Sequence, residues 1–228
     1  MDEIDERGGA FFGRRKGKKL RLGQAYLFET LLPQLRIDLA GDLSPSTLFK
    51  KPVEELWLEI GFGGGEHLLQ RAAENPSVGF IGCEPFVNGM AKMLAAIDRE
   101  SFDNIRLYDS DALDMLRSLP DASLGRVYLL YPDPWPKRRQ NKRRFVSNKT
   151  LALIARVLKP GGEFRFASDI DHYVGWTLER ATRSPNFRWI AERPDDWRLP
   201  WVGWQSTRYE LKAQREGRKS AYLTFERL

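Results

Sequence analysis

Short apolar runs alternate with longer amphipathic stretches from residue 56 onward. The apolar runs have few polar interruptions, which is typical of parallel strands that are buried on both faces. They predict five strands, at residues 56–60, 78–83, 105–108, 127–131 and 163–167. The amphipathic stretches predict helices at about 66–74, 86–99, 112–118, 147–158 and 170–183. This order predicts an α/β fold with a Rossmann-like, doubly wound sheet whose strands are mostly parallel.

The remaining segments depart from this alternation. Residues 187–191 and 221–225 have the pattern of strands with no helix predicted between them, and we expect an antiparallel C-terminal edge pair. Residues 25–40 predict a helix that Pro33 breaks or kinks, and residues 41–55 predict a loop.

The first 24 residues are poor in apolar side chains and rich in Gly, Lys and Arg. This composition cannot bury enough apolar surface to fold by itself, so residues 1–24 are predicted to be a basic, flexible N-terminal arm. A chain of 228 residues that is 42% hydrophobic supports one sizeable core. Residues 25–228 are therefore predicted to form a single domain.

The cysteine and histidine content limits the possible metal and redox chemistry. Cys83, the one cysteine, excludes an internal disulfide and lies in an apolar run that predicts a buried strand. Together with His67 and His172 it does not match the spacing of a zinc site, so we expect no metal, and each histidine is expected to be a surface or core residue. No secretory signal or membrane-spanning run is expected, and the predicted location is the cytoplasm.

Positive charge is concentrated in two places. Residues 7–24 and 137–149 each hold seven basic side chains and no acid, while the net charge of the whole chain is +6, so the rest of the chain is net negative. Such localised charge favours contact with a polyanion. Because neither run has the apolar face of a membrane-binding helix, nucleic acid is a better candidate than an anionic membrane.

A glycine-rich turn follows the first predicted strand. Gly61 and Gly63 would let the backbone approach a ligand closely. The dinucleotide-binding pattern requires a third glycine where this chain has Glu66, and Glu59 adds another carboxylate. Negative charge at this point favours a cationic or amine-bearing ligand such as S-adenosylmethionine over a diphosphate. The alternative is a sharp strand–helix turn without a ligand.

Carboxylates also follow the second and third predicted strands. Glu84 is placed to accept hydrogen bonds from both hydroxyls of a ribose. Asp111 is placed to accept from an adenine amino group, with Ala112 donating its backbone N–H to the ring. Asp111 could instead cap the following helix. Because the carboxyl ends of parallel strands form the binding crevice of this fold, Glu59, Glu84 and Asp111 are expected to meet there.

The fourth predicted strand ends in the most distinctive segment, residues 131–144. Asp133 lies in a proline-rich turn beside Trp135, which suits a flat base carrying polar N–H groups, and the basic run that follows suits phosphates. The alternative is a strand-end turn followed by a solvated charge run. Asp169, after the fifth strand, is expected to face the same crevice.

Three motifs carry a resemblance to a known family: Leu-Glu-Ile-Gly-Phe-Gly at 58–63, Pro-Asp-Pro-Trp-Pro-Lys at 132–137, and Thr-Arg-Tyr-Glu at 207–210. With these motifs the chain resembles the bacterial tRNA (guanine-N7-)-methyltransferases, with matching spacing from about residue 50 to the end. The resemblance implies methyl transfer from S-adenosylmethionine to N7 of guanosine 46 in the tRNA variable loop. It implies tRNA as a partner, and no obligatory protein partner, membrane or metal is inferred.

The resemblance also implies roles for individual residues. The cofactor-binding set is Glu59, Gly61, Gly63, Glu84, Asp111, Ala112 and Asp133, with Asp133 also catalytic. The substrate-binding set is Lys137, Asp169, Thr207, Arg208, Tyr209 and Glu210. The RNA-contacting run is Arg139, Gln140, Asn141, Lys142, Arg143 and Arg144. The chain departs from the family pattern at Tyr131, where the family often has Phe, and at Gly64, where it often has Met.

The chemistry of guanine N7 agrees with an acid-rich site. N7 carries an in-plane lone pair and no proton, so its methylation needs no general base, and a carboxylate would stabilise the cationic product ring. We therefore expect Asp133 to act by electrostatics and orientation. Because the major groove of RNA is too deep to enter, the target guanosine must lie in a loop or an opened tertiary contact.

Three other functions remain open from the residues alone. An amino-group methyltransferase acting on adenine or cytosine has a related motif at this strand end, although Trp135 here separates the prolines. A catalytically silent RNA-binding protein would keep the basic runs, and an NAD dehydrogenase is disfavoured by Glu66. Trp197, Trp201 and Trp204 could form a stacking surface for bases, or they could be ordinary packing residues.

Overall fold

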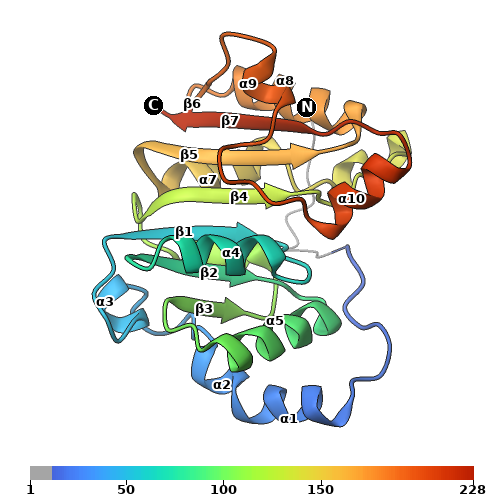
Figure 1. Cartoon of the computed structure of the whole chain (residues 1–228). Coiled ribbons are helices and arrows are strands. Elements are labelled where there is room, and N and C mark those ends of the chain that lie inside the picture. The colour runs from blue at the N-terminus through green and yellow to red at the C-terminus, as the bar shows by residue number, and fades with distance from the viewer. Residues whose placement is uncertain (1–11) are drawn as a thin grey trace.

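The computed structural model describes residues 12–228 and contains a seven-stranded sheet with the strand order β3-β2-β1-β4-β5-β7-β6 (Figure 1). The strands are β1 Glu55–Ile60, β2 Val78–Cys83, β3 Ile105–Tyr108, β4 Leu124–Leu130, β5 Leu158–Ser168, β6 Phe187–Trp189 and β7 Ala221–Arg227. The first five strands are parallel, and β7 pairs antiparallel with both β5 and β6. The predicted α/β sheet and its antiparallel edge pair are confirmed.

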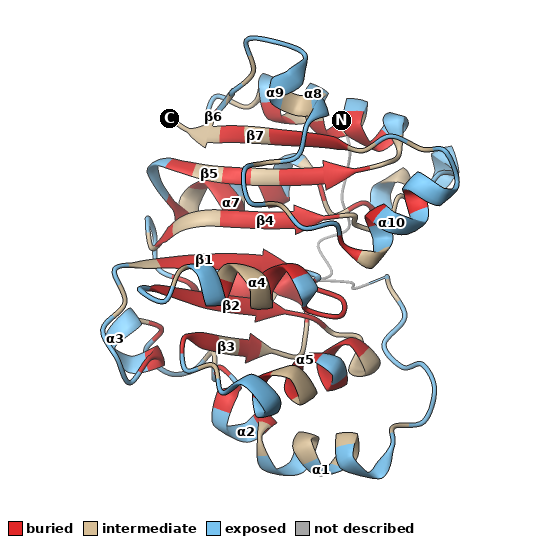
Figure 2. Ribbon diagram, in the orientation of Figure 1, coloured by how far each residue is buried: buried red, intermediate tan, exposed pale blue. Residues whose placement is uncertain are grey.

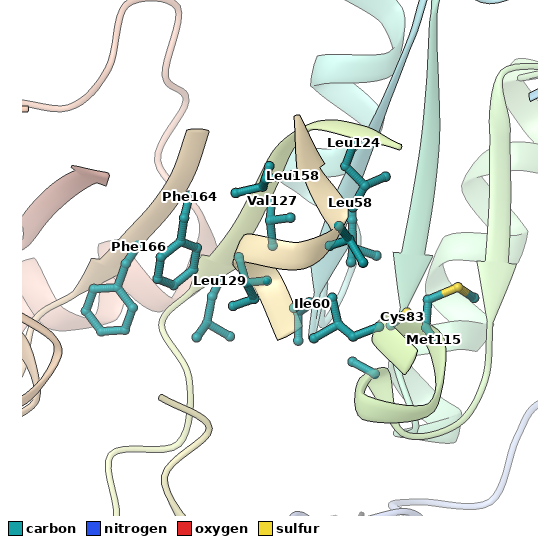
Figure 3. Close-up of a cluster of buried hydrophobic side chains, with 14 of the residues drawn as sticks. Leu58, Ile60, Cys83, Met115, Leu124, Val127, Leu129, Leu158, Phe164 and Phe166 are labelled. Carbon is teal, nitrogen blue, oxygen red and sulfur yellow. The ribbon is translucent and has the colours of Figure 1, made fainter. Parts of the chain in front are cut away.

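Helices cover both faces of this sheet. The helices of the alternating region are α4 Glu66–Glu74, α5 Val87–Glu100, α6 Ala112–Ser118, α7 Asn148–Val157 and α8 Asp171–Arg183. Side chains of α4 and α5 pack into one buried cluster, and side chains of α6, α7 and α8 pack into another on the opposite face (Figure 2). Figure 3 shows part of the second cluster, in which Met115 of α6 lies near Ile60 and Cys83 of the central strands. The predicted burial of Cys83 is confirmed.

The N-terminal part of the fold differs from the single predicted helix. α1 spans Leu22–Thr30 and α2 spans Leu32–Leu35, with Pro33 in the first turn of α2. Proline has no N–H to continue α1, but it is tolerated in a first helical turn, where that donor is not needed. After α2 the chain is extended, and the Ile37 N–H donates to the Leu107 carbonyl at 2.9 Å. A short helix, α3 Pro45–Leu48, interrupts the predicted loop.

The C-terminal part contains two helices that the sequence pattern did not predict. α9 Asp195–Arg198 and α10 Arg208–Arg215 both lie between β6 and β7. Thr207 caps α10, because its Oγ1 accepts a hydrogen bond from the Glu210 N–H at 3.3 Å. Figure 1 shows α10 beside the carboxyl ends of β4 and β5, which is the edge where the site residues gather.

Two further observations concern the chain from residue 12 onward. None of its helices is long and apolar enough to cross a membrane. Within the same residues, no group of three or more His, Cys, Asp or Glu side chains is arranged to hold a metal ion.

Candidate active site

The glycine turn after β1 leads into α4 and contacts α5 at the carboxyl edge of the sheet. Gly61, Gly63 and Gly65 all have positive φ, at 71°, 59° and 85°, which favours glycine at each position. α5 packs directly on this turn, because a Cβ added at Gly89 would overlap the Gly63 carbonyl oxygen. The turn therefore follows a tight backbone path that suits glycine. Gly89 of α5 is also needed, because its missing side chain leaves room for the Gly63 carbonyl.

Glu84, after β2, is held by two backbone donors. Its Oε2 accepts from the Gly63 N–H at 2.6 Å, and its Oε1 accepts from the Phe86 N–H at 2.9 Å. Burial raises the pKa of this carboxyl to about 7, although both hydrogen bonds act in the opposite direction. Each oxygen retains a lone pair, so the side chain can still accept from two further hydroxyl groups.

Asp111, after β3, uses one carboxylate oxygen for the helix cap that the sequence offered as an alternative, and its other oxygen has no partner among the described residues. Its Oδ1 accepts from the Leu113 N–H at 3.0 Å and caps α6. Its Oδ2 is buried and has no hydrogen-bond partner among the residues that the structure describes. Burial raises the pKa of the carboxyl. A buried acceptor without a partner is costly in a free protein, and it marks a position where a ligand could donate.

Glu59, at the end of β1, is paired with a residue that the sequence analysis did not assign to the site. His67 Nδ1 lies 2.7 Å from Glu59 Oε2, and both side chains are buried. The His67 ring also packs against Tyr128 and Trp204, with centroid separations of 4.6 and 5.2 Å. Each histidine was expected to be a surface or core residue, and His67 is a core residue. Its place in the first turn of α4, directly after the glycines, is the signal that could have indicated a partner at the end of β1.

The turn that carries Asp133 has an unusual backbone. Tyr131 and Trp135, at its two ends, have positive φ values of 49° and 42°, a region that bulky side chains rarely adopt. β4 ends at Leu130, one residue before the predicted end, so Tyr131 belongs to the turn. Asp133 is exposed, yet the surrounding atoms displace enough water to raise the pKa of its carboxyl. Strained backbone of this kind clusters at functional sites.

Tyr131 ties this turn to the neighbouring strands. Its N–H donates to the Ala167 carbonyl at 2.8 Å, and its Oη donates to Ser220 Oγ at 2.9 Å. Ser220 immediately precedes β7, so the hydroxyl of Tyr131 connects the turn after β4 to the start of β7.

α10 brings Arg208 and Tyr209, two of the predicted substrate residues, to the glycine turn. A Cβ added at Gly63 would lie 3.2 Å from both Arg208 Nη2 and Tyr209 Cε2. Arg208 Nη2 donates to Tyr209 Oη at 3.1 Å, and Arg208 Nε lies 3.9 Å from Glu66 Oε1. Residues far apart in the sequence therefore meet at one point beside the turn.

Glu210 differs from its expected place in the substrate-binding set. It is 2% exposed, its Oε2 accepts from Trp204 Nε1 at 2.6 Å, and its Oε1 accepts from Tyr222 Oη. The side chain points into the protein and holds α10 on β7, whereas Arg208 and Tyr209 face the glycine turn. Trp204 and Trp201 belong to the same packed group, and Trp197 packs against the core, which agrees with the packing alternative for these three half-buried tryptophans.

The other predicted substrate and RNA contacts differ in how far they are exposed to solvent. Asp169 accepts from Arg218 Nε at 2.6 Å and is mostly buried, whereas Lys137 is exposed. The basic run forms a 3-10 helix, η1 Arg138–Arg143, in which Arg139, Lys142 and Arg143 are exposed while Gln140 and Asn141 are half-buried. Arg144 is an exception, since it is only 4% exposed and faces inward.

The described part of the predicted arm contacts the start of α5. Val87 N–H donates to the Arg15 carbonyl at 2.9 Å, and Asn88 exchanges hydrogen bonds of 2.8 and 2.7 Å with Gly17 and Lys18. Phe12 lies edge-on to Trp135, with ring centroids 6.5 Å apart. Residues 1–11 of the arm lie outside the described residues, and α1 begins at Leu22, before the predicted boundary.

A separate cavity of about 560 Å³ lies over the first halves of β1 and β4. Trp57, Arg126 and the segment 199–202 line it. None of the predicted site residues lines this cavity, so it is distinct from the group of acids at the carboxyl edge.

Comparison with known proteins gives a consistent set of relatives. A model of the family described as "Putative methyltransferase" matches residues 53–223. A tRNA (guanine-N(7)-)-methyltransferase of Rhizobium meliloti is 60% identical over 222 residues, covering 96% of this chain and 95% of the relative. A protein of the same name from Nitrobacter hamburgensis is 58% identical over 221 residues, covering 96% of this chain and 87% of the relative.

Solved structures resemble the chain in fold. The 16S rRNA methyltransferase KamB has a TM-score of 0.55 at 17% identity, covering 82% of this chain and 95% of its own. TrmN from Thermus thermophilus has a TM-score of 0.53 at 16% identity, covering 80% of this chain and 46% of its own. At this level of identity the likeness establishes the methyltransferase fold and nothing finer.

Proposed function

The chain belongs to the tRNA (guanine-N7-)-methyltransferase family, and on that premise we propose that it transfers a methyl group from S-adenosylmethionine to N7 of guanosine 46 in the tRNA variable loop. The observation that carries this proposal is that β1, β2 and β3 are neighbours in the sheet, so their carboxyl ends bring Glu59, Glu84 and Asp111 to one edge, with the Asp133 turn after the adjacent strand β4.

The residues present fit S-adenosylmethionine. The free Oδ2 of Asp111 is suited to an adenine amino group, and the remaining lone pairs of Glu84 are suited to the two ribose hydroxyls. Carboxylates at this edge also favour a cationic ligand. When bound, the cofactor supplies an electrophilic methyl group on a sulfonium sulfur.

Asp133 then has the role of stabilising and orienting the base. Guanine N7 attacks with its lone pair, so no residue of the chain has to remove a proton from that atom. As the new N–C bond forms, the bond from the methyl group to sulfur would break with its electron pair left on sulfur, so the positive charge would move to the purine. A carboxylate beside the purine then favours the transition state over the ground state, in which the base is neutral. The partly desolvated surroundings of Asp133 strengthen that interaction.

The exposed basic residues of η1 are proposed to hold the tRNA backbone. Arg139, Lys142 and Arg143 project from the segment that follows the Asp133 turn, so phosphates bound there would lie close to the reacting base. Binding through such residues is sequence-independent and weakens steeply with salt. A tRNA substrate supports a cytoplasmic location for the reaction.

The test is methyl transfer from labelled S-adenosylmethionine to unmodified tRNA, followed by borohydride reduction and aniline cleavage at alkali-labile 7-methylguanosine. We expect one cleavage in the variable loop, and we expect Asp133→Ala to lose it. Label without cleavage would instead identify an amino-group methyltransferase. tRNA binding without any label would identify a silent RNA-binding protein.

A further inference from the structure

Arg144 ends the basic run, but its surroundings are those of an internal residue. Its guanidinium lies over the rings of Tyr173 and Trp176, at 4.8 and 5.0 Å from their centroids. Nη2 lies 2.9 Å from His172 Nδ1, and burial lowers the pKa of the guanidinium. A cation so enclosed by α8 is poorly placed to meet a phosphate in solvent.

The guanidinium of Arg144 reaches the backbone of the Asp133 turn. Arg144 Nε donates to the Pro134 carbonyl at 2.9 Å. Pro134 follows Asp133 and precedes Trp135, whose φ is 42°. Positive φ at Tyr131 and Trp135 costs on the order of 1–3 kcal/mol each, so this turn keeps its shape only if outside contacts hold it.

The contacts that hold the turn come from its two sides. Tyr131 is held by Ala167 and Ser220, as described above. On the other side, Arg143 lies over Trp135 at 5.0 Å, and Arg144 bonds to the carbonyl between Asp133 and Trp135. Because Pro134 is next to Asp133 in the chain, Arg144 holds the backbone directly beside the carboxylate. Arg144 is itself held by its contacts with α8.

We propose that Arg144 is a positioning residue for Asp133, which holds the Asp133 turn through the Pro134 carbonyl, and that it is not an RNA contact. The inference rests on the proposed function, because it assigns Arg144 to the chemical step of that reaction. α8 provides the fixed platform, through the two aromatic rings and His172. The neighbouring residues Lys142 and Arg143 are exposed and keep their proposed role as tRNA contacts.

The two roles predict opposite behaviour when charge is conserved. Lysine at position 144 keeps the positive charge but loses the Nε donor and the flat group that stacks on the two rings. For a positioning residue, Arg144→Lys lowers kcat about 10- to 100-fold, because small displacements of a reacting group have effects of this size. KM for tRNA and the affinity for S-adenosylmethionine stay unchanged. For a phosphate contact, Arg144→Lys leaves kcat unchanged.

Removal of the charge separates the roles again. Each phosphate contact contributes about 0.7–0.9 to the slope of log affinity against log salt. We expect Lys142→Met to reduce this slope and Arg144→Met to leave it unchanged. A reduced slope for Arg144→Met, matching that of Lys142→Met, would overturn the proposal.

A general loss of folding is distinguished by two further measurements. Exposed His172 can be replaced without opening the core, and we expect His172→Ala to lower kcat in the same direction, by less, with KM for tRNA unchanged. Added guanidinium should restore part of the kcat of Arg144→Ala, because it fits the space between the two rings. Normal kcat in His172→Ala and no rescue would overturn the proposal, whereas inactivity of the wild type would overturn the proposed function instead.

Discussion

Glu84 and Asp111 each accept a hydrogen bond from the backbone N–H two residues further along the chain, whereas the Asp133 turn is held by side chains of residues 144 and 131. The carboxylates on the cofactor side are therefore held by backbone donors of the strand-end turns, and Glu84 also accepts from the Gly63 N–H, 21 residues away. The Asp133 turn depends instead on side-chain contacts, which span 10 residues from Pro134 to Arg144 and 89 residues from Tyr131 to Ser220. The position of a group held by backbone donors depends on the path of the chain. The position of a group held by side chains depends on which residues those side chains belong to.

This difference predicts which changes affect which half of the site. Changes at strand ends should affect cofactor binding and leave kcat at saturating cofactor largely intact. Changes in the contacts of the Asp133 turn should affect kcat and leave cofactor affinity intact.

The largest effect is expected at Glu84. Glu84→Ala removes the acceptor proposed for both ribose hydroxyls, and hydrogen bonds to a charged group contribute about 1.5–3 kcal/mol each. We expect S-adenosylmethionine to bind at least about 100-fold more weakly by calorimetry, with tRNA affinity unchanged. An equal loss of tRNA affinity would show that the two halves are not separable in this way.

The next effect concerns the packing of α5 on the glycine turn. Gly89→Ala would place a methyl group against the Gly63 carbonyl oxygen, and we expect a loss of about 1–3 kcal/mol in the free energy of unfolding. Gly175→Ala in α8 is the matched control, since nothing lies within 4 Å of its added Cβ. It should stabilise the protein by about 0.5–1 kcal/mol, because alanine is the better helix former. Urea unfolding of both variants measures the contrast, and similar values for the two would contradict it.

The pH dependence of cofactor binding sharpens the same comparison. Because burial raises the pKa of Glu84 to about 7, the ligand-free carboxyl is mostly protonated at pH 6 and mostly ionised at pH 8. The carboxylate is the better acceptor for ribose hydroxyls, so affinity for S-adenosylmethionine should rise with pH, by up to about tenfold between pH 6 and 8. In Glu84→Gln the side chain is a neutral amide that does not ionise in this range, so the affinity for S-adenosylmethionine should no longer rise with pH. A rise of the same size in Glu84→Gln would assign the titration to another group.

The smallest effect is expected at the hydroxyl of Tyr131. Tyr131→Phe removes the hydrogen bond to Ser220 and keeps the ring, so about 1 kcal/mol of support for the turn is lost. We expect kcat to fall about fivefold, with cofactor affinity unchanged. Ser220→Ala should have a similar effect, and the double variant should be no worse than either single one. Additive losses would mean that the two groups act independently.

The sequence by itself determined the order of strands and helices in the α/β region and the strand ends that carry Glu59, Glu84, Asp111 and Asp133. These follow from local periodicity, glycine turns and the rule that parallel strands end at one edge. α10 was not predicted, because a short and highly charged helix has few apolar side chains to reveal its period. Its Thr207 cap is recognisable only in the folded structure, where Oγ1 accepts from the Glu210 N–H.

Only the tertiary structure decided which members of a motif face outward. Arg143 and Arg144 are adjacent and alike in sequence, yet one is exposed and the other lies between Tyr173 and Trp176. Glu210 likewise belongs to the same four-residue motif as Arg208 and points to Trp204 and Tyr222. A residue type specifies which contacts a side chain can make, but burial and partners depend on segments that folding brings together from elsewhere in the chain.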